Sequence, residues 1–282
     1  LALRGKSKGK RQQNPLVSLA LIVDQDGFPV RSKVHKGNVG EPATLEEILK
    51  DCGLLEQSDE LFRPAIAMDR GIATKANIEL LQENGFPYTV VERADRRHQY
   101  ADEFIGLKDF ESIEDSKGQV IHLKKMGDHV LCTSEARKNK ENAMALRWIH
   151  RAEVDLQKLQ NSIQRGTFKQ TSVIEQRLAT IRKRYIGFDW AFDSRFLSKA
   201  KSLAYTICHI AEDETNLHGC YVIEFSKIEG DAEAIWRTYT TLTQVEAAFR
   251  SMKTDLGTRP VFHQGAERTE AHLFLSILAE SI

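Results

Sequence analysis

The chain has 282 residues, of which 41% are hydrophobic and 28% are charged, and its 40 basic and 40 acidic residues cancel to a formal net charge of zero. These fractions are those of an ordinary globular protein with one large domain or two small ones. Four scattered cysteines without a C-x-x-C pair argue against a zinc site. Neither a signal peptide nor an apolar run of membrane-spanning length is visible, so we expect a cytoplasmic protein with reduced thiols.

The first third of the chain alternates strand and helix patterns. We expect strands at residues 16–23, 28–35, 63–68 and 88–91, and helices at 45–55 and 74–84. The first strand is nearly all apolar, which is typical of a buried strand, and Asp24-Gln25-Asp26-Gly27 predicts a hairpin turn after it. Thr44 and Thr74 are predicted helix N-caps, and Gly85 is a predicted C-cap. This order of elements indicates an α/β fold.

The middle of the chain predicts two amphipathic helices and several strands. Apolar residues recur at helical spacing over 142–164 and 173–186, with Gly166 between them, so we expect a helical hairpin with basic outer faces. Expected strands lie at residues 104–107, 120–123, 129–132, 204–210 and 220–225. Two further helices, at 232–256 and 267–279, are expected to close the chain.

The balanced net charge hides an uneven distribution of cations. Residues 1–40 hold eight basic residues against two acidic ones: Arg4, Lys6, Lys8, Lys10, Arg11, Arg31, Lys33 and Lys36 against Asp24 and Asp26. Residues 137–201 are also rich in Lys and Arg. Clustered positive charge indicates a phosphate-binding surface, although residues 1–13 by themselves fit a flexible, solvated segment.

A charged pattern near the C-terminus carries the most chemistry. Tyr239, Glu246, Arg250 and Lys253 are spaced so that they would share one helix face. A carboxylate can hold a hard divalent metal, and flanking cations can bind phosphate. The pattern therefore suits metal-dependent chemistry on a nucleic-acid backbone. The alternative is a solvated face whose opposite side is buried, with these residues inside: Val245, Phe249 and Met252.

This stretch resembles the signature helix of DDE transposases of bacterial insertion sequences, in which Tyr, Arg, Glu and Lys follow one another at fixed spacing. Tyr239, Glu246 and Lys253 match that spacing, whereas Leu242 occupies the position of the Arg. The resemblance covers about residues 14–92 and 217 to the end. Its flanking motifs are Phe249-Arg250, Arg259-Pro260-Val261-Phe262-His263, Arg268 and Ala271-His272-Leu273.

Asp69 is the second candidate residue. It follows the strand predicted at 63–68, and open α/β sheets place their sites at the carboxyl ends of strands. Taken alone, Asp-Arg-Gly after a strand also fits a turn. The text around it, 67–72 followed by Asn77, resembles the segment that carries the second catalytic Asp of the same family.

The resemblance implies an α/β fold with a ribonuclease-H-like mixed sheet and flanking helices, interrupted by an α+β insertion. We expect these segments: a basic flexible segment at 1–13, the first part of the core at 14–92, the insertion at 93–217 and the C-terminal part of the core at 218–282.

The resemblance also implies an enzyme of DNA transposition that cleaves element ends and transfers strands to target DNA, with Mg²⁺ or Mn²⁺ as cofactor. It implies that Asp69 and Glu246 are catalytic residues and metal ligands, and that Tyr239, Arg250 and Lys253 contact DNA. The implied partners are DNA and further copies of the chain on that DNA, and no membrane.

The family's first catalytic Asp would precede the hairpin, where the chain has no Asp. Asp24 and Asp26 are predicted turn residues, on the order of 20 Å from Asp69. We therefore expect a transposase that is truncated at its N-terminus and inactive alone. The alternatives are a DNA-binding remnant or inhibitor of an intact transposase, an interaction protein built on the hairpin at 137–186, and another ribonuclease-H-like nuclease such as a resolvase.

Overall fold

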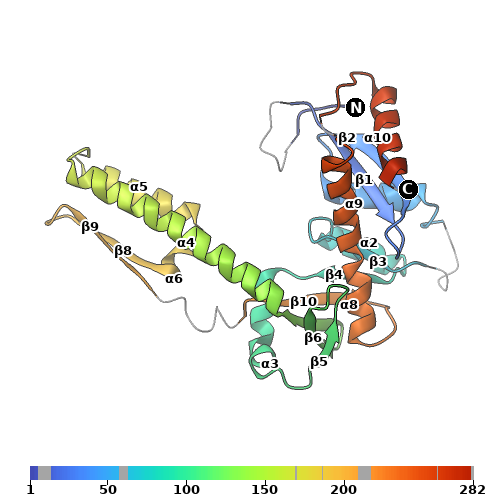
Figure 1. Cartoon of the computed structure of the whole chain (residues 1–282), viewed down its shortest axis with the longest axis horizontal. Coiled ribbons are helices and arrows are strands. Elements are labelled where there is room, and N and C mark those ends of the chain that lie inside the picture. The colour runs from blue at the N-terminus through green and yellow to red at the C-terminus, as the bar shows by residue number, and fades with distance from the viewer. Residues whose placement is uncertain are drawn as a thin grey trace. The chain divides into compact units, whose positions relative to one another are not determined.

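The computed structural model describes residues 1–5, 14–56, 63–168, 170–185, 187–208, 217–258 and 260–280 (Figure 1). The chain divides into two compact units. Unit 1 comprises Leu1–Ala94, Leu123–Leu131 and Val222–Ile282, and unit 2 comprises Asp95–His122 and Cys132–Tyr221.

The described strands form three sheets. A two-stranded sheet pairs β1 with β2, a six-stranded sheet has the order β3-β4-β10-β7-β6-β5, and a second two-stranded sheet pairs β8 with β9. In the six-stranded sheet β3 is parallel to β4, whereas β10 is antiparallel to β4. The strands are β1 (Val17–Val23), β2 (Pro29–Lys36), β3 (Ile66–Met68), β4 (Tyr88–Val91), β5 (Glu111–Glu114), β6 (Val120–Met126), β7 (His129–Ser134), β8 (Phe192–Leu197), β9 (Ser202–Ile207) and β10 (Cys220–Ser226).

Helices accompany these sheets, so the chain is a mixed α/β protein, as predicted. The helices are η1 (Glu41–Thr44), α1 (Leu45–Asp51), α2 (Lys75–Glu83), η3 (Ala94–Tyr100), α3 (Ala101–Gly106), α4 (Glu135–Gln164), α5 (Thr171–Arg184), α6 (Phe188–Ala191), α8 (Ala232–Thr240), α9 (Leu242–Thr254) and α10 (Ala266–Glu280). The six-stranded mixed sheet with flanking helices fits the ribonuclease-H-like fold that the sequence predicts.

The predicted β1–β2 hairpin is present, and its turn has the predicted chemistry. Asp24 Oδ1 accepts hydrogen bonds from the backbone N–H groups of Asp26 and Phe28, each 2.9 Å long. Gly27 adopts φ +90°, which a residue with a side chain rarely adopts. The prediction that β1 is buried is wrong, because all seven of its residues are partly exposed. Among the described strands β1 pairs with β2 alone, so part of its surface reaches solvent.

One buried core cluster of unit 1 lies around β3 and β4. Thr74 caps α2 as predicted, since its hydroxyl accepts from the N–H of Asn77 at 3.3 Å, and Gly85 follows the helix at φ +72°. Thr44 occupies the predicted N-cap position of α1 but makes no capping hydrogen bond, because a 3₁₀ turn precedes α1 and the Thr44 hydroxyl donates to the carbonyl of Glu41 instead. The buried residues of this layer are Leu45, Leu49, Met68, Ala73, Leu81, Phe86, Tyr88 and Val90.

The predicted helical hairpin is present in unit 2, as α4 and α5. Figure 1 shows α4 as one long helix with α5, α6 and the β8–β9 ribbon beside it. Over its 30 residues α4 extends about 45 Å at the α-helical rise. Its buried face, in which Ala152 and Leu156 are fully inaccessible, packs on Leu178 of α5 and Phe188 of α6.

Several other sequence predictions need correction. The strand predicted at 104–107 is wrong, because these residues end α3 and Leu107 turns into left-handed backbone at φ +44°. Strands β5 and β8 were not predicted. The helix predicted over 232–256 is two helices, α8 and α9, with Thr241 between them.

Candidate active site

Asp69 follows β3 and heads a loop that backbone hydrogen bonds close. The Asp69 carbonyl accepts from the N–H groups of Ile72 at 2.9 Å and Ala73 at 3.2 Å. Arg70 Nη1 donates to the carbonyl of Ala73 at 2.7 Å, which ties the same loop from the side. The Asp69 side chain itself is exposed, so the loop presents a carboxylate at the carboxyl end of a strand, as predicted.

Asn77 holds the far end of this loop. Its side-chain amide is buried and donates to the carbonyls of Ile72 at 2.7 Å and Pro42 at 2.9 Å. One side chain therefore joins the loop after β3 to the segment after β2. The Asn that accompanies Asp69 in the sequence therefore has a structural role, which is to hold these two segments together. Both hydrogen bonds are needed, because a buried amide without partners destabilises the fold.

Glu41 lies beside Asp69, which sequence reasoning missed. A Cβ atom built on Gly71 would lie 3.2 Å from Glu41 Oε2 and 3.6 Å from Asp69 Oδ2. Both carboxylates therefore lie next to the same glycine, in a space that a side chain at position 71 would enter. Glu41 and Asp69 are far apart in the sequence and belong to no shared motif, so no spacing rule connects them.

Helix α9 carries the other candidate residues. Glu246, Arg250 and Lys253 are all exposed, whereas Ala248 and Met252 are buried. The predicted exposed face is therefore present, with a carboxylate and two cations in two turns of helix. The Lys253 ammonium lies 5.1 Å from the centre of the Phe249 ring, a cation–π contact that restrains its side chain.

Tyr239 lies on a different helix from Glu246. It is partly exposed and belongs to the last turn of α8, whereas Glu246 lies in the second turn of α9. The prediction that all four residues share one continuous helix is therefore wrong. Threonine hydroxyls donate back to helix carbonyls through this region, including Thr241 to Thr238 and Thr243 to Thr240, and such bonds bend helices.

The hairpin turn lies against the start of α9. A Cβ on Gly27 would lie 2.8 Å from Gln244 Oε1, so the turn contacts the helix two residues before Glu246. Asp24 keeps the turn role expected for it, because its carboxylate accepts the turn N–H groups.

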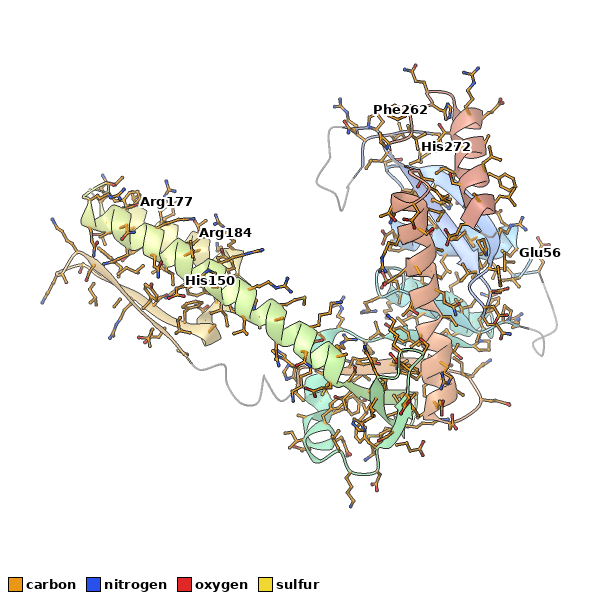
Figure 2. All side chains as sticks on the ribbon, viewed as in Figure 1. Glu56, His150, Arg177, Arg184, Phe262 and His272 are labelled. Atoms are coloured by element: carbon orange, nitrogen blue, oxygen red, sulfur yellow. The ribbon has the colours of Figure 1, made fainter. Side chains whose placement is uncertain are left out.

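The described residues do not assemble a complete metal site. Among them, no group of three or more His, Cys, Asp or Glu side chains could hold a metal ion. Of the other family-like residues, Phe262 is 86% exposed (Figure 2). The rings of His263 and His272 meet edge to face with centres 5.4 Å apart. Arg259 lies outside the described residues.

No helix within the described ranges combines the length and the apolar character that crossing a bilayer requires. Searches of the curated proteins and of the solved structures found no match. A comparison with models of protein families found the family described as "Transposase DDE domain", which matches residues 2–280. Because this match spans almost the whole sequence, the chain belongs to the DDE transposase domain family.

Proposed function

We propose that the chain acts in DNA transposition, by metal-dependent cleavage and strand transfer at the ends of an insertion sequence. The observation that carries this proposal is the family match over residues 2–280. The exposed carboxylates of Asp69, after β3, and Glu246, on α9, support it, since both belong to unit 1.

Asp69 and Glu246 are proposed to be catalytic residues and ligands of Mg²⁺ or Mn²⁺. Their chemistry fits these ions, because Mg²⁺ takes hard carboxylate oxygens and is bound by one or two protein carboxylates together with water and substrate phosphate. A bound divalent ion would polarise the scissile phosphate and lower the pKa of the attacking water or hydroxyl. The protein's part is to hold the two carboxylates, and the Arg70 and Asn77 hydrogen bonds fix the loop that holds Asp69.

Tyr239, Arg250 and Lys253 are proposed to contact DNA near the cleaved end. Arg250 and Lys253 lie one and two turns after Glu246 on the same exposed face of α9. A backbone phosphate that approaches Glu246 would therefore meet two cations, and Arg can bind its oxygens in a bidentate manner. Copies of the chain assembled on paired DNA ends would complete the active complex.

The 282 residues alone are proposed not to cleave DNA. The family uses three carboxylates, whereas this sequence offers two at the matching positions, and the described residues contain no cluster of three metal-binding side chains. The same observation favours the second candidate function, a DNA-binding remnant that inhibits an intact transposase.

Iron-directed backbone cleavage tests the metal assignment without requiring activity on DNA. Fe²⁺ replaces Mg²⁺, and ascorbate with peroxide then generates radicals that cut the polypeptide near the bound ion. We expect cuts next to Asp69 and next to Glu246 that excess Mg²⁺ suppresses and that Asp69→Asn weakens at both places. Glu270→Gln, an exposed carboxylate on α10, is the matched control. Cuts at neither residue would exclude this metal site.

A nicking assay tests the proposed lack of activity. Supercoiled DNA is incubated with the purified chain and either Mg²⁺ or Mn²⁺, beside the Glu246→Gln variant. We expect no nicking above background for either protein. Nicking that Glu246→Gln abolishes would contradict the proposed inactivity and would assign Glu246 to catalysis.

A further inference from the structure

Helix α4 carries a continuous line of cations on one side. Every Lys and Arg between positions 140 and 165 belongs to this line, which we name the α4 stripe: Lys140, Arg147, Arg151, Lys158 and Arg165. Their separations of seven, four, seven and seven residues place them within about 20° of one line along an α-helix. The stripe extends about 38 Å at the helical rise.

All five side chains of the α4 stripe are exposed. The buried face of α4, with Ala152, Leu156 and Leu159, lies on the far side of the helix from the stripe and packs on α5, α6 and β9. Figure 2 shows side chains standing out from the helix along its length. We call α4, α5, α6, β8 and β9 together the arm. The stripe lies on a surface that the buried core of the arm does not occupy.

The stripe carries charge of one sign. The acidic residues of the same span, Glu141, Glu153 and Asp155, lie off the line, and the positions between the cations on the line are Met144, Val154 and Ser162. A solvated helix face usually alternates positive and negative charges three or four residues apart, which pair with one another. The α4 stripe lacks that alternation, so its cations repel one another unless an anionic partner binds.

Asp155 is the one carboxylate in the described part of the chain that contacts the stripe, 3.6 Å from Lys158. It is already engaged elsewhere, since it accepts from Arg184 at 2.6 Å and from the Tyr185 hydroxyl at 2.9 Å. Burial raises the pKa of Asp155, but these hydrogen bonds outweigh it and hold the pKa below its usual value. The carboxylate therefore offsets the charge of Arg184 as well as that of Lys158.

The dimensions of the stripe fit duplex DNA. Its length is about one helical turn of B-DNA, which presents one phosphate charge per roughly 1.7 Å of axis. Single-stranded nucleic acid is usually held by aromatic side chains that stack on bases. The line contains no aromatic residue, and the neighbouring Trp148 is occupied by stacking on Tyr185, with ring centres 6.4 Å apart.

We propose that the α4 stripe binds the phosphate backbone of duplex DNA, as a surface separate from the carboxylates of Asp69 and Glu246. The choice of DNA as the partner rests on the proposed function. Since the stripe contacts only phosphates, the binding is independent of base sequence and orients the duplex along the arm.

Salt titration of DNA binding tests this proposal on the full chain. Affinity for a 40-base-pair duplex is measured by fluorescence anisotropy at several KCl concentrations. The stripe variant combines Lys140→Gln, Arg151→Gln and Arg165→Gln, exposed positions where Gln has a similar helix propensity. We expect the slope of log affinity against log salt to become less steep by about 3 and the affinity at 0.1 M KCl to fall roughly a hundredfold.

A charge-matched control distinguishes the effect of the stripe on DNA binding from the effect of a lower net charge. It combines Lys183→Gln, Arg195→Gln and Lys199→Gln, three exposed cations of the same arm that lie off α4. We expect this control to keep the wild-type slope to within about 1. Circular dichroism and thermal melting confirm that both variants are folded.

Each outcome decides between the proposals. An unchanged slope in the stripe variant, together with weaker binding after Lys253→Gln, would overturn the stripe and leave the proposed function standing. Equal losses in the stripe variant and the control would also overturn the stripe. Stripe-dependent binding to single strands or to phosphatidylserine vesicles but not to the duplex would overturn duplex DNA as the partner. A wild-type chain that binds no duplex even at 20 mM KCl would overturn both proposals.

Discussion

Replacing Glu141 by Gln should destabilise the base of the arm. Glu141 is 19% exposed and joins three parts of unit 2. Its carboxylate accepts from Arg97 Nη1 and Arg137 Nε, each at 2.9 Å, and from the N–H of Gly219 at 3.1 Å. Arg137 also stacks on the Tyr221 ring, with its guanidinium carbon 4.3 Å from the ring centre. One carboxylate therefore links η3, α4 and the segment that enters β10.

The loss of stability expected for Glu141→Gln can be estimated from the cation that the substitution leaves unpaired. The variant keeps the shape of the side chain but leaves Arg97, which is only 13% exposed, without its counter-charge. Removing one partner of a buried ion pair costs roughly 3–5 kcal/mol, and since this pair retains some solvent contact we expect about 3 kcal/mol. For a unit of this size that corresponds to a fall in Tm of roughly 10 °C.

The dependence on pH gives a second signature. Burial raises the pKa of Glu141, but the hydrogen bonds from Arg137, Gly219 and Arg97 outweigh it, so the pKa lies below its usual value of 4.5. A lowered pKa stabilises the fold above the pKa of the unfolded chain, and that stabilisation is lost as the pH falls through the folded value. The wild type and the variant should therefore differ most near neutral pH and converge below pH 4.5.

Urea denaturation followed by circular dichroism between pH 3 and 7 measures both effects. Glu135→Gln, an exposed residue in the first turn of α4, is the control and should cost about 0.5 kcal/mol through the helix dipole. A loss below about 1 kcal/mol for Glu141→Gln at pH 7, or a difference that does not shrink in acid, would refute the reasoning.

Two further substitutions test how much the turns at Gly219 and Asp24 contribute to stability. Gly219→Ala should cost about 3 kcal/mol in urea denaturation, because position 219 has φ +86° and the new Cβ would lie 2.7 Å from the Ser134 carbonyl oxygen. Gly118→Ala has a similar φ of +71° but nothing within 4 Å, so it should cost only about 1 kcal/mol, and equal losses would contradict the clash. Asp24→Ala should cost about 1 kcal/mol by removing both turn hydrogen bonds, whereas Asp26→Ala should be near neutral; hydrogen exchange of the Phe28 amide measures the difference.

Local chemistry explains which elements could be predicted from the sequence. The hairpin turn, the Thr74 cap and the C-cap at Gly85 each depend on residues within a few positions of one another, and all three are present. The arm was predicted because its apolar residues keep helical spacing over two long stretches. Short apolar runs carry less information, and the strand predicted at 104–107 is part of α3 because such runs fit either structure.

Only some residues of the candidate site could be predicted from the sequence. Asp69 and Glu246 were identified by family-like text, and each lies on the kind of element that was expected. Glu41 could not be found in this way, because its carboxylate reaches Gly71 only after the segments that follow β2 and β3 fold against each other. Asn77 makes that contact specific by donating to carbonyls of both segments.

The break at Thr241 shows why periodicity alone could not place Tyr239. Thr241 keeps helical backbone angles, φ −56° and ψ −25°, so the apolar pattern continues through it from α8 into α9. The break lies in the hydrogen-bond pattern instead, because the Thr241 hydroxyl donates to the carbonyl of Thr238 at 2.8 Å, within the last turn of α8. A hydrophobic pattern indicates which side of a helix is buried and carries no information about such hydrogen bonds. Thr241 consequently divides Tyr239 from Glu246 between two helices, although the signature motif does not include this threonine.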